Sequence, residues 1–137
     1  MGNSALALLG FVSWTLLLLV TMGGLRTVLV LTGKRAANQF SPDGSDVSAF
    51  SNRLCRAHAN CYENLPLFAA VILLALVMGR SGITDPLALW FLGARVAQSA
   101  VHLVSTSHYA VLARFALFLA QWFILVFWVF RLVTTAA

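Results

Sequence analysis

The sequence is poor in charged residues. They make up only 9% of its 137 residues, and just four are acidic. A soluble domain carries about 25% charged and about 45–50% apolar residues, whereas this chain is 61% apolar. Such a composition cannot cover a surface that faces water, and it is too hydrophobic for disorder. The formal charge of +5 does not indicate nucleic acid as a partner, because the nine lysines and arginines are spread along the chain.

Cysteine and the common catalytic motifs are also scarce or absent. Cys55 and Cys61 lie six residues apart, which is neither a CxxC redox pair nor a zinc spacing, so we read them as free thiols. There is no Walker loop, GxGxxG or GxSxG, so nucleotide and serine-hydrolase chemistry have no support. His58, His102 and His108 show no HxxxH or HExxH spacing and no acidic cluster, so no metal is expected.

Long apolar runs are the dominant feature of the chain. A membrane-spanning helix needs about 20 mostly apolar residues. Four such segments occur, separated by the polar loop 32–51 and two short connections, and they are continuous rather than alternating, which argues against a barrel. The sequence predicts an all-α, integral membrane four-helix transmembrane bundle in one domain, 1–137. The predicted helices cover about residues 5–31, 53–79, 86–106 and 110–133.

Two local details follow from this division of the chain. Residues 80–85 read as a tight turn, with Pro86 at the first position of the third helix and Thr84 or Asp85 as its cap. The four tryptophans read most simply as residues that face lipid or the membrane surface.

The distribution of lysine and arginine predicts the orientation. Six basic residues lie in or beside loops 1 and 3, against two at the opposite ends of the helices, which predicts that loops 1 and 3 are cytoplasmic. Both termini then face the outer side, and the compact chain is typical of a bacterial inner-membrane protein. The six residues are Arg26, Lys34, Arg35, Arg53, Arg56 and Arg114, and the two are Arg80 and Arg131.

Polar residues form a stripe on each of the two middle helices. Residues spaced i, i+3 or i+4, and i+7 share one face of a helix, and an ionisable residue at the centre of a span costs about 2.5–3.5 kcal/mol. We therefore expect the two stripes to face each other in a polar seam inside the bundle. The stripes are Arg53, Arg56, Asn60 and Glu63 on the second helix, and Arg95, Gln98 and His102 on the third.

Structural and functional interpretations of these stripes both stay open. Glu63 either pairs with Arg95 or another arginine to neutralise a buried charge or belongs to a ligand site, and Asn60 either joins two helices or contacts a ligand. Arg53 and Arg56 also fit ordinary flanking charges that reach toward water. A cluster of arginines with one glutamate suits a small anionic ligand with carboxylates, because guanidinium binds carboxylate in a bidentate manner.

The segment RAHANCYENLPLF, residues 56–68, closely resembles the signature of the MAPEG family, the membrane-associated proteins of eicosanoid and glutathione metabolism. That signature runs Arg-Ala-x-x-Asn-x-x-Glu, followed by an apolar pair and Pro-x-Phe or a close variant. The segment Gly93-x-Arg95-Val96-Ala97 resembles the family's motif in the third helix. The length, the four spans and the long first loop also agree, so the resemblance covers nearly the whole chain.

The resemblance implies a homotrimer of four-helix subunits in the lipid bilayer, with glutathione as co-substrate in cytoplasm-facing pockets between subunits. By likeness, Arg56, Asn60 and Glu63 hold the charged ends of glutathione and Arg95 contacts it. Arg114 is the nearest candidate for the arginine that stabilises the thiolate, and Lys34 or Arg35 corresponds to a basic contact after the first helix.

The chain departs from the family pattern at the positions of two helix-3 tyrosines, which are Gln98 and His102 here. His102 or Tyr109 are the candidates to replace them. An arginine often found where Ala59 stands is also missing.

Three functions remain open from the sequence. The first is a glutathione-dependent transferase or peroxidase that acts on hydrophobic electrophiles or lipid hydroperoxides. The second is a non-catalytic scaffold or small-anion or lipid-binding member of the family. The third is a small-molecule transporter, for which the chain offers no inverted repeat.

Overall fold

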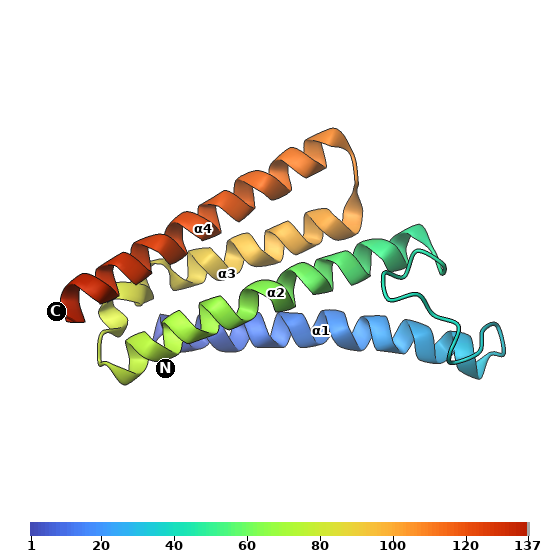
Figure 1. The fold of residues 1–137 in the computed structure, drawn as a ribbon, viewed down its shortest axis with the longest axis horizontal. Helices are drawn as coiled ribbons and strands as arrows, with labels where there is room; N and C mark the ends of the chain where they lie inside the picture. Colours follow the sequence, from blue (N-terminus) through green and yellow to red (C-terminus); the bar gives the residue numbers. More distant parts are fainter. Residues whose placement is uncertain (137) are drawn as a thin grey trace.

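The computed structural model describes residues 1–136, and within them it contains four long α-helices and no strand. Each helix is long and apolar enough to cross a membrane. This confirms the predicted all-α bundle of four membrane-spanning helices. The helices are α1 (Asn3–Leu31), α2 (Ala49–Val77), α3 (Ser81–Val104) and α4 (His108–Ala136) (Figure 1).

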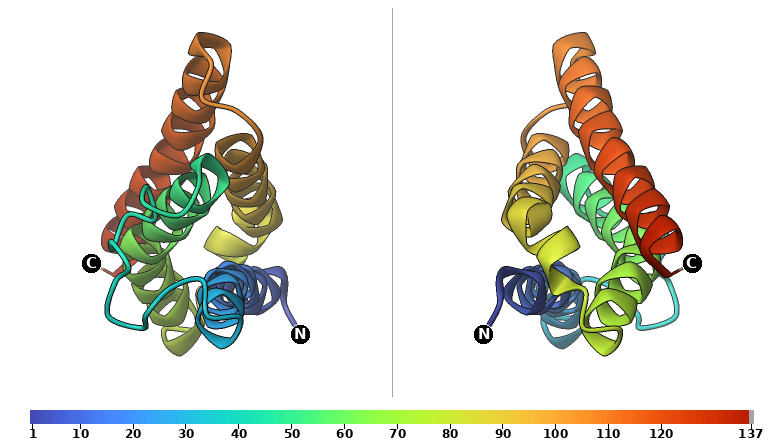
Figure 2. Two further views of the ribbon diagram at one scale, coloured as in Figure 1. Left: turned by 90° about the vertical axis from the view of Figure 1, so that its right-hand side faces the viewer. Right: turned by 90° about the vertical axis from the view of Figure 1, so that its left-hand side faces the viewer.

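The helices run up and down, so the chain termini lie at one end of the bundle and loops 1 and 3 at the other (Figure 1). α3 packs against all three other helices, whereas the backbones of α1 and α4 do not lie next to each other within the described residues. Seen end-on, α2 and α3 lie between α1 and α4 (Figure 2). α4 also diverges from α3 toward loop 3 (Figure 1). The membrane side of each end remains a prediction.

An aromatic cluster from all four helices fills the centre of the bundle. Phe11, Phe68, Phe91 and Trp128 have no exposed surface, and the rings of Phe68 and Phe91 stack with centroids 4.4 Å apart. Trp128 packs 5.9 Å from the ring of Phe91. The expectation that every tryptophan faces lipid or the membrane surface is therefore wrong for Trp128, because its position on α4 is turned toward the core.

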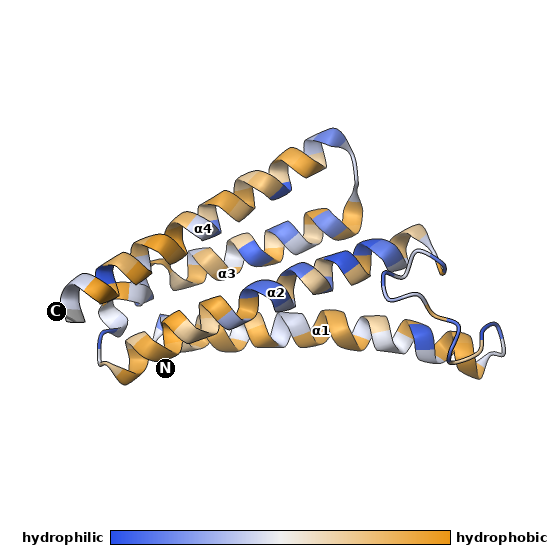
Figure 3. Cartoon of the chain, viewed as in Figure 1, coloured by the Kyte–Doolittle hydropathy of each residue, from blue (hydrophilic) through white to orange (hydrophobic). Residues whose placement is uncertain are grey.

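The outer surface is apolar over most of its length, whereas polar positions gather in the half of α2 and α3 nearer loops 1 and 3 (Figure 3). α2 begins at Ala49 rather than 53, because the Ser48 hydroxyl accepts a hydrogen bond from the Ser51 amide at 3.0 Å and caps the helix. Loop 1 is correspondingly shorter, at residues 32–48. α4 is longer than predicted at both ends, since it runs from His108 to Ala136.

The predicted turn at residues 80–85 is wrong. α3 already begins at Ser81, and Pro86 lies inside the helix rather than at its first position. Asp85 caps a different helix instead: its Oδ1 accepts from the Ser4 amide at 2.7 Å and the Ser4 hydroxyl at 2.6 Å. α1 has no side-chain cap of its own, so this carboxylate satisfies a free N–H at its positive end.

Loop 1 is folded through its own side chains. Arg35 forms an ion pair with Asp46 at 2.5 Å, and the Ser41 amide donates to the same carboxylate at 3.0 Å. Hydrogen bonds from Ser41 and Ser45 lower the pKa of Asp43 to about 2. These contacts fix the path of the chain between α1 and α2.

Candidate polar ligand site between α2, α3 and α4

The two predicted polar stripes meet at Asn60 and Arg95. Arg95 is 1% exposed, and its Nη1 donates to the side-chain Oδ1 of Asn60 and, at 3.4 Å, to the Asn60 carbonyl. The guanidinium carbon also lies 5.4 Å from the ring centroid of Phe11, a distance that permits a cation–π interaction. The prediction that α2 and α3 face each other through polar residues is confirmed at this pair.

Glu63 is not the partner of Arg95. Among residues 1–136 the structure contains one ion pair, Arg35–Asp46, and Glu63 is exposed. The interpretation of Glu63 as the neutralising partner of Arg95 is therefore wrong. The neutral amide of Asn60 takes that place, because it lies one turn closer to loop 1 on α2 and can offer an oxygen without a second charge.

The two cysteines are free and buried, as predicted. The Cys61 sulfur lies 3.2 Å from the Ser99 hydroxyl, which in turn donates to the Arg95 carbonyl at 3.0 Å. These small polar groups pack directly behind the Asn60–Arg95 contact and hold α2 against α3.

A second polar contact, which the sequence analysis missed, joins α3 to α4. Gln121 Nε2 donates to Gln98 Oε1 at 2.9 Å, and both side chains are buried. The signal in the sequence was a single amide inside the apolar run 110–133. The predicted site residue Gln98 therefore already has a protein partner for its oxygen, while Gln121 Oε1 is buried without one.

A third contact lies nearer to loop 3. Arg114 Nη1 lies 2.7 Å from His102 Nδ1. Since arginine can only donate, the imidazole nitrogen accepts, which assigns its proton to Nε2. The structure thus brings the predicted residues His102 and Arg114 together on α3 and α4.

Three residues of the α2 stripe remain. Arg53 is hydrogen-bonded to α3, whereas Arg56 and Glu63 are not held by an ion pair within the described residues. Arg53 Nε donates to the Leu103 carbonyl at 2.8 Å, so Arg53 satisfies a carbonyl in the last turn of α3. Arg56 and Glu63 are exposed and belong to no ion pair within residues 1–136. They flank Asn60 on the same face of α2.

The other predicted residues lie outside this cluster. Arg35 is committed to Asp46 and to the Gln39 carbonyl within loop 1, and Lys34 is exposed. Tyr109 is 83% exposed at the start of α4, and its ring lies beside that of His108. Within residues 1–136, no three side chains of histidine, cysteine, aspartate or glutamate gather as metal ligands would.

Comparison with known proteins gives one match. No curated protein and no solved structure matches the chain. The sequence model of the MAPEG family matches residues 4–134, nearly the whole length. The Asn60–Arg95 contact joins the RAHANCYENLPLF and Gly93-x-Arg95 segments of this chain. The chain therefore belongs to the MAPEG family.

Proposed function

We propose that this protein is an integral-membrane, glutathione-dependent transferase or peroxidase that acts on hydrophobic electrophiles or lipid hydroperoxides. One observation carries the proposal. Asn60 is held in place by the buried Arg95, while the charged side chains on either side of it, Arg56 and Glu63, remain free. Family membership supports a glutathione-related membrane function in general.

The spacing of these groups suits glutathione. Arg56 and Glu63 are seven residues apart, which is about 10.5 Å along a helix, and an extended tripeptide reaches about 10 Å. Glutathione carries carboxylates, which can pair with the guanidinium of Arg56, and an ammonium group, which can pair with the carboxylate of Glu63. Asn60 Nδ2, whose partner oxygen is taken by Arg95, is free to donate to the peptide between them.

The chemistry requires a thiolate. A thiol with a pKa near 8.5 is mostly protonated at neutral pH, and an adjacent guanidinium favours the charged nucleophile. We assign this role to Arg114, which His102 holds through its Nδ1. The thiolate then attacks an electrophilic carbon and forms a thioether as the leaving group departs with its bonding electron pair. In the peroxidase reaction, two glutathione molecules reduce a hydroperoxide to an alcohol and water and are themselves oxidised to the disulfide.

The same face of α2 supports assembly as a homotrimer. Glu63 lies 14 residues from each end of α2 (Ala49–Val77), and it is exposed in the single chain. A charged residue in this position is costly against lipid. A second copy packed over Arg56 and Glu63 would cover both charges and enclose the glutathione between subunits.

A conjugation assay on detergent-purified protein tests the activity. We expect turnover of a generic aromatic electrophile with glutathione, and Arg114→Gln should lower kcat by at least about tenfold while Arg80→Gln, at the opposite end of the bundle, leaves it unchanged. Arg114 acts by increasing the fraction of glutathione that is ionised to the thiolate. The decrease in kcat of Arg114→Gln should therefore become smaller as the pH rises, because the thiol then ionises without the arginine. Equal turnover by both variants would contradict the role of Arg114.

The non-catalytic alternative has its own supporting observation. Gln98 and His102 are already bound to Gln121 and Arg114, and within residues 1–136 the exposed Tyr109 makes no side-chain hydrogen bond to either of them. If glutathione binds but neither electrophiles nor hydroperoxides turn over, the scaffold or anion-binding function replaces the enzymatic one. Glutathione flux into proteoliposomes would favour the transporter.

A further inference from the structure

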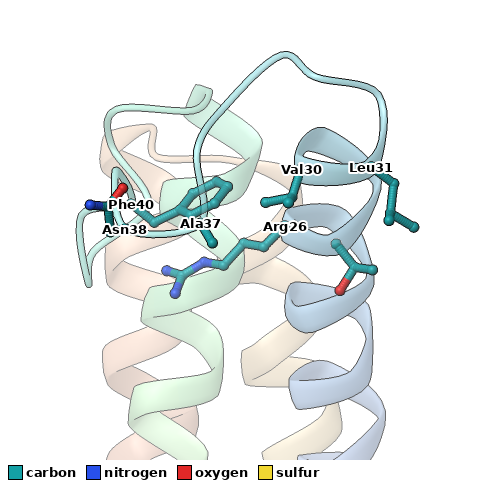
Figure 4. A pocket seen from close by; sticks show the side chains of 7 residues that line it. Arg26, Val30, Leu31, Ala37, Asn38 and Phe40 are labelled. Atoms are coloured by element: carbon teal, nitrogen blue, oxygen red, sulfur yellow. The ribbon is translucent and has the colours of Figure 1, made fainter.

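A cavity of about 460 Å³ lies at the loop 1 end of α1, away from the contacts that join α2, α3 and α4. Its size is within the range of about 300–1,000 Å³ that is usual for sites of small ligands. Figure 4 shows it between the last turns of α1 and the part of loop 1 that contains Ala37, Asn38 and Phe40. The cavity is lined by Arg26, Thr27, Val30, Leu31, Ala37, Asn38 and Phe40.

Arg26 is the only charged residue in that lining. It lies five residues before the end of α1 at Leu31, about 7.5 Å along the helix, and so near the depth where an apolar helix leaves the membrane. Its side chain extends from α1 toward Phe40 (Figure 4). The end of α1 therefore places a positive charge near the border between lipid and water.

The guanidinium is held in place but not neutralised. Arg26 Nη2 donates to the Ser41 carbonyl at 3.1 Å and approaches the Cys55 sulfur at 3.9 Å, and its carbon lies 5.5 Å from the ring centroid of Phe40. Arg26 belongs to no ion pair within residues 1–136, and its Nε is buried without an acceptor. An unpaired donor of this kind is costly at low dielectric.

Loop 1 neutralises a neighbouring arginine but not Arg26. Arg35 also lies over the ring of Phe40, at 5.8 Å, yet Asp46 pairs with it. Asp43, the other carboxylate of the loop, accepts from Ser41 and Ser45. Neither carboxylate of loop 1 is thus left to pair with Arg26, so its charge is available to an anion from outside the chain.

The rest of the lining indicates what that anion is attached to. Asn38 is exposed at the cavity and adds a side-chain amide to the same lining as the guanidinium. Val30 and Leu31 form an apolar wall, and Leu31 is 80% exposed. A ligand that suits the cavity is negatively charged at one end and apolar at the other, which describes a lipid whose phosphate enters from the membrane surface.

We propose that the cavity between α1 and loop 1 binds the phosphate headgroup of an anionic phospholipid through Arg26 and Asn38, with its glyceride end against Val30 and Leu31. This site is separate from the glutathione site proposed above. It does not depend on that proposal, because none of its lining residues belongs to the α2 and α3 stripes.

Lipid retention by the full-length protein tests the proposal. The purified protein in detergent is titrated with phosphatidylglycerol or phosphatidylcholine, and bound lipid is counted by native mass spectrometry. We expect one tightly held phosphatidylglycerol per chain, with an affinity at least about tenfold above that for phosphatidylcholine. Arg26→Gln should weaken the binding of phosphatidylglycerol at least about tenfold. Arg80→Gln removes one positive charge at the opposite end of the bundle and should leave this binding unchanged.

A second pair of variants protects against misfolding of Arg26→Gln, because Arg26 also ties down loop 1. Asn38→Asp places a negative charge in the lining of the cavity and should weaken the binding of phosphatidylglycerol severalfold. Gln39→Glu makes the same change one residue away, outside the lining, and should leave binding intact. The proposal would be overturned if Arg26→Gln and Arg80→Gln, or Asn38→Asp and Gln39→Glu, lost phosphatidylglycerol affinity equally. It would also be overturned if the wild type bound phosphatidylglycerol no more tightly than phosphatidylcholine.

Two further measurements are needed. One distinguishes a lipid headgroup from a soluble phosphate ester, and the other distinguishes this cavity from the proposed glutathione site. Soluble glycerol phosphate should not displace the lipid at equal concentration, and displacement would overturn a lipid as the occupant. Arg26→Gln and Asn38→Asp should keep the glutathione affinity of the wild type. Loss of both ligands together in these variants would show that the cavity is part of the glutathione site and would overturn a separate lipid site.

Discussion

Arg95 on α3 donates to the side-chain oxygen of Asn60 on α2, and this contact joins the two helices at the centre of the candidate site. Arg95 is 1% exposed, so the amide of Asn60 is its principal side-chain partner there. The contact gives Arg95 Nη1 an acceptor without a carboxylate beside it, whereas Arg95 Nε is buried without one among the described residues. It also leaves Glu63 free for a ligand.

The first prediction concerns the energy of this contact. Asn60→Ala leaves the buried Arg95 without its side-chain acceptor, and we expect a loss of about 1–3 kcal/mol of stability. Arg95→Met removes the charge that needs the acceptor, so the double variant should lose less than the sum of the two single variants. Unfolding in mixed detergent micelles measures this coupling. Additive losses would show that Asn60 does not hold Arg95.

The second prediction concerns the buried amide pair between α3 and α4. Gln121→Leu leaves Gln98 Oε1 without its donor, and a hydrogen bond between membrane helices contributes about 0.6–1.7 kcal/mol. Gln98→Leu combined with Gln121→Leu should recover most of that loss, because two apolar residues leave no unpaired group. The same unfolding assay distinguishes recovery from a further decrease.

The third prediction uses two glycines of loop 1 with the same backbone conformation. Gly33 and Gly44 both have φ of 69°, which disfavours a side chain. A Cβ at Gly44 would lie 2.9 Å from the Ser51 carbonyl and 2.8 Å from the Cys55 sulfur, whereas at Gly33 it would meet nothing within 4 Å. Gly44→Ala should therefore lower the melting temperature more than Gly33→Ala does. Equal decreases would mean that loop 1 does not pack closely on α2.

The fourth prediction is a pH dependence of loop 1. The Ser41 amide and the charge of Arg35 lower the pKa of Asp46 below its usual 3.8. A group with a lowered pKa in the folded state stabilises that state above its unfolded pKa, and this stabilisation is lost as the pH falls through the folded value.

Protection of loop 1 from hydrogen exchange should accordingly stay constant from pH 7 to about 5 and decline below about 3.8. Asp46→Asn should reduce protection already at neutral pH and make the acid-dependent decline smaller, with Asp43 contributing what remains of it. Protection that is unchanged in this variant would contradict the role of the Arg35–Asp46 pair.

Much of the fold could be predicted from the sequence because long apolar runs have few alternatives in a membrane. The helical spacing of the polar residues around Asn60 on α2, and of those that follow Arg95 on α3, also predicted which face of each helix is polar. Periodicity does not determine which residue of a neighbouring helix lies opposite. That depends on the rotation and offset of each helix, which is why Glu63 was a candidate partner for Arg95 and Gln121 was overlooked.

The cap of α1 was missed for a related reason. Asp85 lies before a proline, where a carboxylate usually caps the helix that follows in sequence. Here its partner is Ser4, which is 81 residues away along the chain. Local patterns describe neighbours in sequence, whereas the up-and-down topology places the start of α1 beside the start of α3.

Glutathione binding to the detergent-purified protein, measured by calorimetry, tests the central claim most directly. The wild type should bind at submillimolar to millimolar concentrations. Glu63→Gln changes an exposed side chain that holds no other residue, so it should fold normally and weaken binding at least about tenfold, or about 1.4 kcal/mol. Arg80→Gln should bind as the wild type does. No heat from the wild type at millimolar glutathione, or equal affinity in Glu63→Gln, would contradict the proposed site.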